Sequence, residues 1–346
     1  MKRFLVGEVA VLLVLVIVAV FVRLGIGNSH EQLGGADQNQ ETTLSTEDTQ
    51  VLATVDTTPQ ESTTVTLPEE TKPSWMTFPE GLSLKAQQYF VYEVETGEYL
   101  ACSGTVEDQV YPASITKIFT AYVALQYLDP KEVITVNWDI SQAVYPGSSI
   151  ARIDWGDKLT TEMLVEAMLL PSGNDAAYIL AVQAGREITG KSKLEWSKAK
   201  EAFMTEMNAQ AQALGLSGTH FANPDGIHRE NHYTNFQDLA KIASLVLGND
   251  TIMKYAKINA DYVTFASGEE RKWENTNELI NPDSDYYCPY ALGLKTGQTP
   301  RAGSCLLSAF RYEGRTFVIG VFACPQIADR FTDTLQLFNK AIGITG

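Results

Sequence analysis

The chain reads Pro112-Ala113-Ser114-Ile115-Thr116-Lys117 where a strongly apolar segment begins. Large apolar side chains then recur at helical spacing, at Ile115, Ile118, Phe119, Tyr122 and Leu125. This spacing predicts a helix that opens at the quoted stretch. Residues three positions apart share a helix face, so Ser114 and Lys117 place a hydroxyl and an amine one turn apart. A serine hydroxyl is a weak nucleophile until a base takes its proton, and the pair is therefore a candidate nucleophile and base.

Two further short motifs, Ser172-Gly173-Asn174 and Lys295-Thr296-Gly297, lie downstream. The serine of the first motif fits a proton relay to a leaving group, and its asparagine offers an amide to a peptide backbone. The lysine and threonine of the second suit a carboxylate, and its glycine permits close approach of a substrate. Each motif alone has an ordinary interpretation as a turn, a strand end or a helix cap. Together, each at the start or break of an element, they favour a catalytic site.

Lys117 must be neutral to act as a base. Moving a lysine pKa from about 10.4 to about 7 requires roughly 4–5 kcal/mol. Burial beneath the helix is one source, and repulsion from Lys295 in the same pocket is another, worth roughly 3–4 kcal/mol at an effective dielectric of about 20. We therefore predict a neutral Lys117 beside a charged Lys295. The backbone N–H of Ser114, near a helix N-terminus, is a natural half of an oxyanion hole.

Histidine is the commoner base, and the chain has four, His30, His220, His228 and His232. His228 and His232 are four residues apart, but their segment is turn-like and lacks the H-E-x-x-H pattern of a zinc helix. These residues are interpreted as loop histidines with local hydrogen bonds rather than metal ligands. The sequence predicts no metal and no cofactor.

The 346 residues carry a net charge of −16, which argues against a nucleic-acid partner. The four cysteines form no C-x-x-C pair, so a zinc ribbon or thioredoxin-like site has no support. Their even number leaves open both disulfides and buried free thiols; they are Cys102, Cys288, Cys305 and Cys324.

The N-terminal quarter predicts attachment to a membrane. Basic residues 1–3 precede a segment, residues 4–23, that is apolar except for Glu8 and Arg23. About 19 apolar residues span roughly 28 Å as a helix, close to the hydrocarbon thickness of a bilayer. A cleaved signal peptide is the alternative, but residues 24–27 fit its cleavage site poorly. We expect a cytoplasmic tip (1–3), a single membrane anchor (4–23), a disordered acidic tether (24–75) and an extracytoplasmic catalytic domain (76–346).

The fold class predicted for that domain is α/β in the α+β sense. Strand pairs with tight turns are expected at both ends, at 89–94 with 98–102 and at 304–312 with 316–323, and a further strand at 292–299. Helices are expected between them. The expected build is one antiparallel sheet made from both ends of the domain, flanked by helices, with a helical insertion.

Several helix boundaries follow from capping residues. Thr160 or Thr161 is expected to cap a helix through Leu170, and Asp175 to cap the next, at 176–184. A helix at 194–214 should stop at Gly215. The run 234–237 fits a capping box before a helix that ends near 247–248. A closing helix is expected at 327–342.

The chain resembles a low-molecular-mass penicillin-binding protein, a serine D-alanyl-D-alanine carboxypeptidase of the β-lactamase/transpeptidase-like fold. The resemblance runs from about residue 87 to 343 and rests on four motifs, Tyr111–Lys117, Leu170–Ala177, Asn223–Gly226 and Gly293–Gly297. S-x-x-K and K-T-G mark this family, and Ser-Gly-Asn is its usual second motif.

The resemblance implies an acyl-enzyme on Ser114, formed from a peptidoglycan stem peptide that ends in D-Ala-D-Ala and then hydrolysed by water. Lys117 would be the base, Ser172 the relay, and Asn174, Lys295, Thr296 and Gly297 would bind substrate. The N–H of Gln298 would complete the oxyanion hole, and Arg330 would hold the terminal carboxylate. β-Lactams such as penicillin would be inhibitors.

One residue departs from the family pattern, and several related functions remain as alternatives. Position 298 is often histidine or aromatic in the family, so Gln298 is expected to alter substrate preference. A β-lactamase lacks support because no Glu-x-x-Leu-Asn loop lies at the expected distance. A transpeptidase or endopeptidase of the same fold, or a non-catalytic tethered binding module, stays open as an alternative.

Overall fold

The computed structural model describes residues 81–343. Within that part of the chain, no helix has the length and apolar character needed to cross a bilayer. The predicted anchor at 4–23 and most of the domain boundary region lie outside the described residues, as does the predicted tether.

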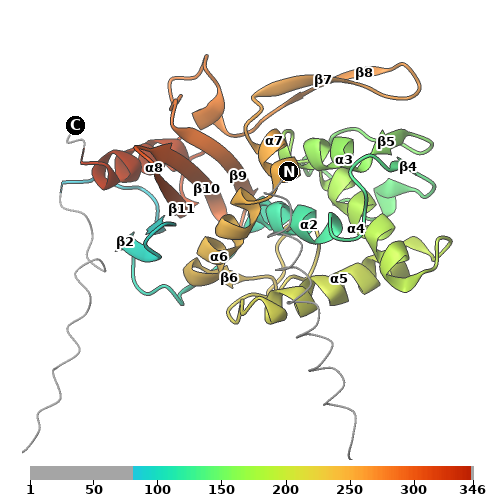
Figure 1. The fold of residues 1–346 in the computed structure, drawn as a ribbon, viewed down its shortest axis with the longest axis horizontal. Helices are drawn as coiled ribbons and strands as arrows, with labels where there is room; N and C mark the ends of the chain where they lie inside the picture. Colours follow the sequence, from blue (N-terminus) through green and yellow to red (C-terminus); the bar gives the residue numbers. More distant parts are fainter. Residues whose placement is uncertain (1–80, 344–346) are drawn as a thin grey trace, which may run out of the picture. The chain divides into compact units, whose positions relative to one another are not determined.

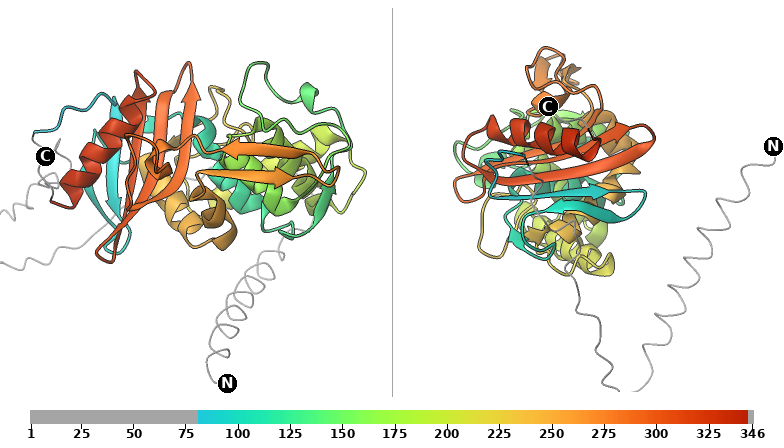
Figure 2. Two further views of the ribbon diagram at one scale, coloured as in Figure 1. Left: turned by 90° about the horizontal axis from the view of Figure 1, so that it is seen from above. Right: turned by 90° about the vertical axis from the view of Figure 1, so that its left-hand side faces the viewer.

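A five-stranded antiparallel sheet brings the two ends of the described chain together (Figures 1 and 2). Its strand order is β2-β1-β11-β10-β9, so the first hairpin pairs with the last strand. This confirms the predicted sheet built from both ends of the domain. The bounds are β1 Gln88–Glu93, β2 Glu98–Cys102, β9 Ala291–Thr299, β10 Gly303–Tyr312 and β11 Arg315–Cys324.

Both faces of the sheet are covered, which explains why β10 and β11 are buried along most of their length. On one face lies α8 (Asp329–Ala341), where Phe338 stacks on Phe310 with ring centroids 4.2 Å apart. On the other face Phe90 of β1 packs on Phe236, at the start of α6 (Phe236–Leu247). Figure 2 shows α8 lying across the sheet on the side away from the other helices.

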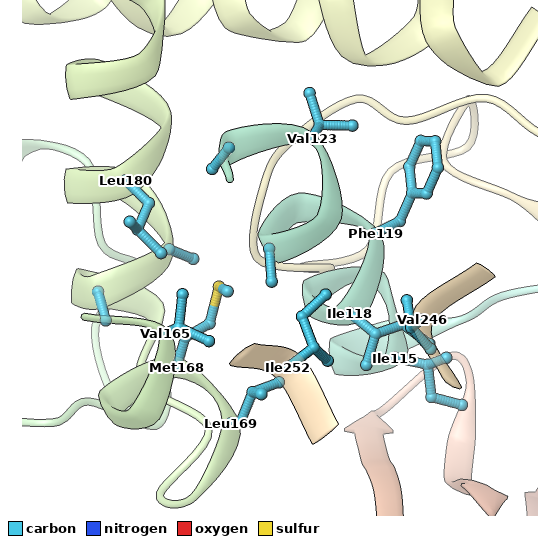
Figure 3. Packing of buried hydrophobic residues seen from close by; sticks show 14 of the residues in the cluster. Ile115, Ile118, Phe119, Val123, Val165, Met168, Leu169, Leu180, Val246 and Ile252 are labelled. Carbon is cyan, nitrogen blue, oxygen red and sulfur yellow. The ribbon is translucent and has the colours of Figure 1, made fainter. Parts of the chain in front are cut away.

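The helix of the opening motif is the centre of the helical part. A short 3₁₀ turn, η2 (Ala113–Ile115), leads into α2 (Thr116–Ala124), and every residue of α2 except Tyr122 is buried. Figure 3 shows its apolar side chains packed against neighbours such as Val165, Leu180 and Ile252. An enclosed helix of this kind holds the side chains at its first turn in fixed positions.

The remaining helices pack around α2 (Figure 1). The helices are α3 Thr161–Leu169, α4 Asn174–Thr189, α5 Trp196–Ala213 and α7 Asp250–Ala256, with 3₁₀ turns η3 Ile140–Gln142 and η4 Glu278–Ile280. The short strands pair as β3 Gln109–Val110 with β6 Thr234–Asn235, β4 Val133–Thr135 with β5 Lys158–Thr160, and β7 Ala260–Thr264 with β8 Glu270–Glu274. The β4–β5 and β7–β8 pairs lie farther out than the helices (Figure 1).

Two predicted caps are wrong. Asp175 does not cap α4, which begins at Asn174; its carboxylate instead accepts the N–H groups of Ala151 and Ile153 at 2.9 and 3.0 Å. The cap of α6 is Asn235, whose side chain accepts the N–H of Asp238, so the predicted capping box does not form. The Asp175 carboxylate also accepts the N–H of Ala176 at 2.9 Å, so it bonds the first turn of α4 as well as the loop at 151–153. Helix α7 and the β7–β8 hairpin were not predicted.

Candidate active site

Ser114 and Lys117 meet as the sequence predicts. The amine of Lys117 lies 2.8 Å from the Oγ atom of Ser114. It also donates a 2.6 Å hydrogen bond to the backbone carbonyl of Asp225. Lys117 is fully buried, whereas Ser114 is partly exposed at the base of a cavity. The amine is thus enclosed behind the hydroxyl and reaches the cavity only through it.

Burial makes Lys117 easier to deprotonate. Loss of water around the amine lowers the pKa of Lys117 from 10.5 to about 8, although the nearby carboxyl groups of Asp225 and Asp175 partly oppose this. A lysine with a pKa of about 8 is neutral in a substantial fraction of molecules at mildly alkaline pH. The predicted lowering of the Lys117 pKa therefore has its cause in burial.

The segment Asn223–Ile227 supports the nucleophile from behind. Gly226, at φ +88°, lies so close to η2 that a Cβ atom there would stand 1.9 Å from the carbonyl oxygen of Ala113. The Asn223 side chain accepts the N–H of Gly226 and donates to the carbonyl of Ile227, which fixes the turn. The sequence marked this segment as part of the resemblance but assigned it no role.

Two residues at the site hold left-handed backbone conformations that are uncommon for residues with side chains. Ala113, just before the nucleophile, has φ 48°, and Ser172 has φ 61°. Such conformations cost of order 1–3 kcal/mol and persist where surrounding contacts impose them. Ser172 lies between α3 and α4, and Asn174 begins α4; both side chains are buried at the rim of the cavity.

Strand β9 supplies the third motif. The amine of Lys295 lies 3.4 Å from the hydroxyl of Thr296 and 3.5 Å from that of Thr276, and the two hydroxyls are 2.5 Å apart. Thr276 carried no signal in the sequence. Gly297 has a further role beside the predicted one: a Cβ there would lie 2.8 Å from the carbonyl oxygen of Pro112, so glycine lets β9 lie against the backbone at the start of η2.

The two lysines share one site, and burial lowers the pKa of both. Burial lowers the pKa of Lys295 well below its ordinary value, and the positive charges of Lys117 and Arg330 lower it further. Lys117, by contrast, has the carboxyl groups of Asp225 and Asp175 near it. Both lysines therefore lose a proton more easily than a lysine in water, and the pattern of a neutral Lys117 beside a charged Lys295 stays a prediction.

Arg330, in the first turn of α8, points a buried guanidinium into the same cavity. Its Nη1 atom lies 3.5 Å from the carbonyl of Gly297, and its Nε has no hydrogen-bond partner among the described residues. Burial lowers the pKa of Arg330 to about 10. A buried cation without a carboxylate is costly, so the position is prepared for an anion.

The cavity has a volume of about 670 Å³ and gathers the predicted residues. Seven of the nine line it: Ser114, Ser172, Asn174, Thr296, Gly297, Gln298 and Arg330. Lys117 and Lys295 lie beneath it, each bonded to a lining hydroxyl. Among residues 81–343 there is no cluster of His, Cys, Asp and Glu arranged to hold a metal ion.

The fold and this geometry agree with a known family. The family model described as D-alanyl-D-alanine carboxypeptidase matches residues 75–323. The chain belongs to the D-alanyl-D-alanine carboxypeptidase family. Members of this family are serine-type hydrolases of the cell wall, and the sheet with its helical part is the penicillin-binding-protein fold.

Curated members of the family are similar over the catalytic part. The D-alanyl-D-alanine carboxypeptidase of Streptomyces sp. (strain K15) is 35% identical over 242 residues, 67% of this chain and 78% of that protein. DacF of Bacillus subtilis is 28% identical and DacA of Escherichia coli is 26% identical. The match covers 63% of DacF and 53% of DacA, so the chain spans less than two thirds of either relative.

Solved members share the fold. The DD-transpeptidase of the same Streptomyces strain superposes with a TM-score of 0.68 and 31% identity, covering 75% of this chain and 98% of that one. Penicillin-binding protein D2 of Listeria monocytogenes, solved in its cefotaxime bound form, gives 0.62 and 25%, covering 76% and 100%.

Other predicted features of this family member are also resolved. His232 is buried: its Nδ1 accepts the N–H of Ala222 and its Nε2 lies 2.8 Å from the hydroxyl of Thr116, as expected of a histidine with local partners. The four cysteines are buried free thiols, which settles the alternative of disulfides.

Proposed function

We propose that this protein is a serine DD-carboxypeptidase that removes the terminal D-alanine from peptidoglycan stem peptides, with Ser114 as nucleophile. The observation that carries the proposal is the 2.8 Å contact between the Lys117 amine and the Ser114 hydroxyl at the base of a cavity that the Arg330 guanidinium also lines. Membership of the family indicates the reaction, and these residues supply its nucleophile, its base and its carboxylate-binding group.

Binding of the substrate prepares the base. The terminal carboxylate of the peptide lies near Arg330, Lys295 and the hydroxyl of Thr296, where charge and hydrogen bonds stabilise it. A negative charge there favours the protonated form of Lys295. A protonated Lys295 in turn lowers the pKa of Lys117, because two buried ammonium groups repel each other. Substrate thus favours a neutral Lys117 beside a charged Lys295.

Acylation then proceeds by one proton path. Lys117 takes the proton of Ser114, and Oγ attacks the carbonyl carbon of the penultimate D-alanine. The N–H groups of Ser114 and Gln298 stabilise the oxyanion. The C–N bond breaks, and the leaving amine of the last D-alanine receives the proton through Ser172. Water then attacks the acyl-enzyme, which frees the shortened peptide and Ser114.

Transfer to an amine is the second candidate reaction, because the solved relative from Streptomyces is a DD-transpeptidase. An amine in place of water would give transpeptidation from the same acyl-enzyme. A cross-linked peptide as the acyl donor, followed by attack of water, would give endopeptidase action. A strained β-lactam acylates Ser114 by the same steps and acts as an inhibitor. We further propose that residues 4–23 anchor the protein as a single-pass membrane protein with its catalytic domain outside the cytoplasm.

The test combines labelling with product release. Fluorescent penicillin should label the protein and remain bound, and a pentapeptide ending in D-Ala-D-Ala should release D-alanine. Ser114→Ala should abolish both. Lys117→Arg should slow acylation by about 10²–10⁴-fold, because a guanidinium does not give up its proton. Rapid turnover of penicillin would identify a β-lactamase, and absence of labelling would identify a non-catalytic module.

A further inference from the structure

A second cavity opens beside the active site, on the loop that joins β4 to β5. We call it the aromatic groove; it has a volume of about 730 Å³ and is lined by Asp175 and by residues between 139 and 155. Three of its lining residues are large, apolar and exposed: Tyr145 at 62%, Ile150 at 46% and Trp155 at 68%. A single exposed apolar side chain is ordinary, but three that line one groove mark a binding surface.

The loop that carries these side chains is firmly attached to the domain. The buried carboxylate of Asp175 accepts the N–H groups of Ala151 and Ile153. The indole N–H of Trp273 donates to the carbonyl of Ala151, at 3.2 Å. The carbonyl of Ser149 accepts the N–H of Asn174 at 2.9 Å. The aromatic groove is therefore preorganised, and little conformational entropy of the loop backbone is lost when a ligand binds there.

The aromatic groove adjoins the active-site cavity. Both cavities are lined by Tyr145, Pro146, Gly147 and Ser148, so the two lie on either side of this segment and a large substrate can occupy both. The groove is also polar at its edges, where Asp139, Arg152 and Asp154 take part in the lining. Flat apolar platforms bordered by carboxylates and a guanidinium suit a ligand with apolar faces and a hydroxyl-rich rim.

This chemistry is that of a sugar. A pyranose ring presents its C–H groups to an aromatic face, while its hydroxyl and acetamido groups bond to charged side chains. The proposed substrate carries such a ligand, because a stem peptide is attached to a strand of N-acetylated amino sugars. An anionic membrane surface fits poorly, since the groove contains three aspartates, Asp139, Asp154 and Asp175.

We propose that the aromatic groove binds the glycan strand of peptidoglycan while the attached stem peptide occupies the active site. The proposal rests on the proposed function for its ligand, and Trp155 and Tyr145 are its sugar platforms. The groove thus favours peptides on polymeric glycan over free peptides of the same sequence.

Direct binding provides the first test, with full-length protein carrying Ser114→Ala so that no turnover occurs. Peptide-free glycan strands and the tetrasaccharide of N-acetylglucosamine should quench and shift tryptophan fluorescence. Trp155→Ala should abolish this response. The matched control is Tyr262→Ala, because Tyr262 is 70% exposed but lines neither cavity. Absence of saccharide binding, or a response to anionic phospholipid vesicles alone, overturns the proposal whether or not the enzyme releases D-alanine.

Kinetics provide the second test and separate this proposal from the catalytic one. In the active enzyme, Trp155→Ala should raise KM for glycan-linked pentapeptide about tenfold, which corresponds to about 1.4 kcal/mol, and change KM for free pentapeptide less than about twofold. Tyr262→Ala should change neither. An equal loss on both substrates would show that Trp155 supports the fold or the active site and would overturn the proposal. Absence of D-alanine release from the parent enzyme would contradict the proposed function instead.

Discussion

The backbone carbonyl of Asp225 accepts a 2.6 Å hydrogen bond from the amine of Lys117. The side chain of the same residue is buried, and its Oδ2 has no hydrogen-bond partner among the described residues. One residue therefore acts on the lysine twice: its carbonyl orients the amine, and its carboxyl group raises the lysine pKa.

This arrangement predicts how acylation depends on pH. The rate of penicillin acylation should rise with pH through about 8, as Lys117 loses its proton. Asp225→Asn removes a negative charge beside Lys117 and keeps the carbonyl, so the Lys117 pKa should fall. The rising limb should move to lower pH by about one half to one unit. Asp283→Asn, at an exposed site, is the control, and an unshifted limb in Asp225→Asn would contradict the prediction.

Gly226 and Gly268 form a matched pair for testing the close contact behind the nucleophile. Both have φ +88°, but a Cβ at Gly226 would lie 1.9 Å from the Ala113 carbonyl oxygen, while one at Gly268 would meet nothing within 4 Å. Gly268→Ala should cost about 1–2 kcal/mol of stability, from backbone strain, and leave acylation unchanged. Gly226→Ala should cost more and slow acylation at least about 100-fold. Urea unfolding and penicillin labelling measure the two effects; equal behaviour would refute a role for the contact.

His232 predicts a loss of stability in acid. Burial lowers its pKa from 6.5 to about 3, so between these values the unfolded chain binds a proton that the folded protein does not. Its contribution to the free energy of unfolding is therefore complete above about pH 6.5 and falls by about 1.4 kcal/mol per pH unit as pH drops toward 3. His232→Gln should lower stability at pH 7, because the bond to Thr116 changes, but flatten this slope. Chemical denaturation between pH 7 and 4 measures the difference, and equal slopes would rule the assignment out.

Arg330 should affect binding and stability in opposite directions. Arg330→Gln should raise KM for a peptide with a free terminal carboxylate about tenfold or more, and have little effect on a peptide whose terminus is amidated. It should also stabilise the unliganded protein, because it removes a buried charge that lacks a carboxylate partner. Steady-state kinetics on the two peptides and thermal unfolding test both parts. Equal changes on the two peptides would exclude a role in carboxylate binding.

The sequence predicts most of what depends on local pattern. The hairpins at both ends of the domain and the contact between Ser114 and Lys117 follow from alternation and helical spacing. Seven of the nine predicted site residues lie in three short motifs, whereas Gln298 and Arg330 were assigned from the family resemblance. Tight turns identified the strand partners within each hairpin, but not which strands join the two hairpins into one sheet.

What the sequence did not predict depends on contacts between distant segments. Asp225 acts on Lys117 through a backbone carbonyl 108 residues away, and a carbonyl leaves no mark on residue type. Thr276 meets Thr296 only after β9 has paired. Asp175 bonds the loop at 151–153 as well as the first turn of α4. The lowered pKa of each lysine likewise follows from its burial in the fold and from the charges placed near it.

The pairing of β1 with β11 has a consequence for synthesis of the chain. The nucleophile lies in the first third of the described residues, but the sheet that holds β9 against η2 closes only when β11 joins it. On the ribosome, a nascent chain that has not yet released β11 has no completed carboxylate-binding edge. Such long-range closure is slow compared with helix formation. The chain can thus become active only after nearly the whole catalytic domain has left the ribosome.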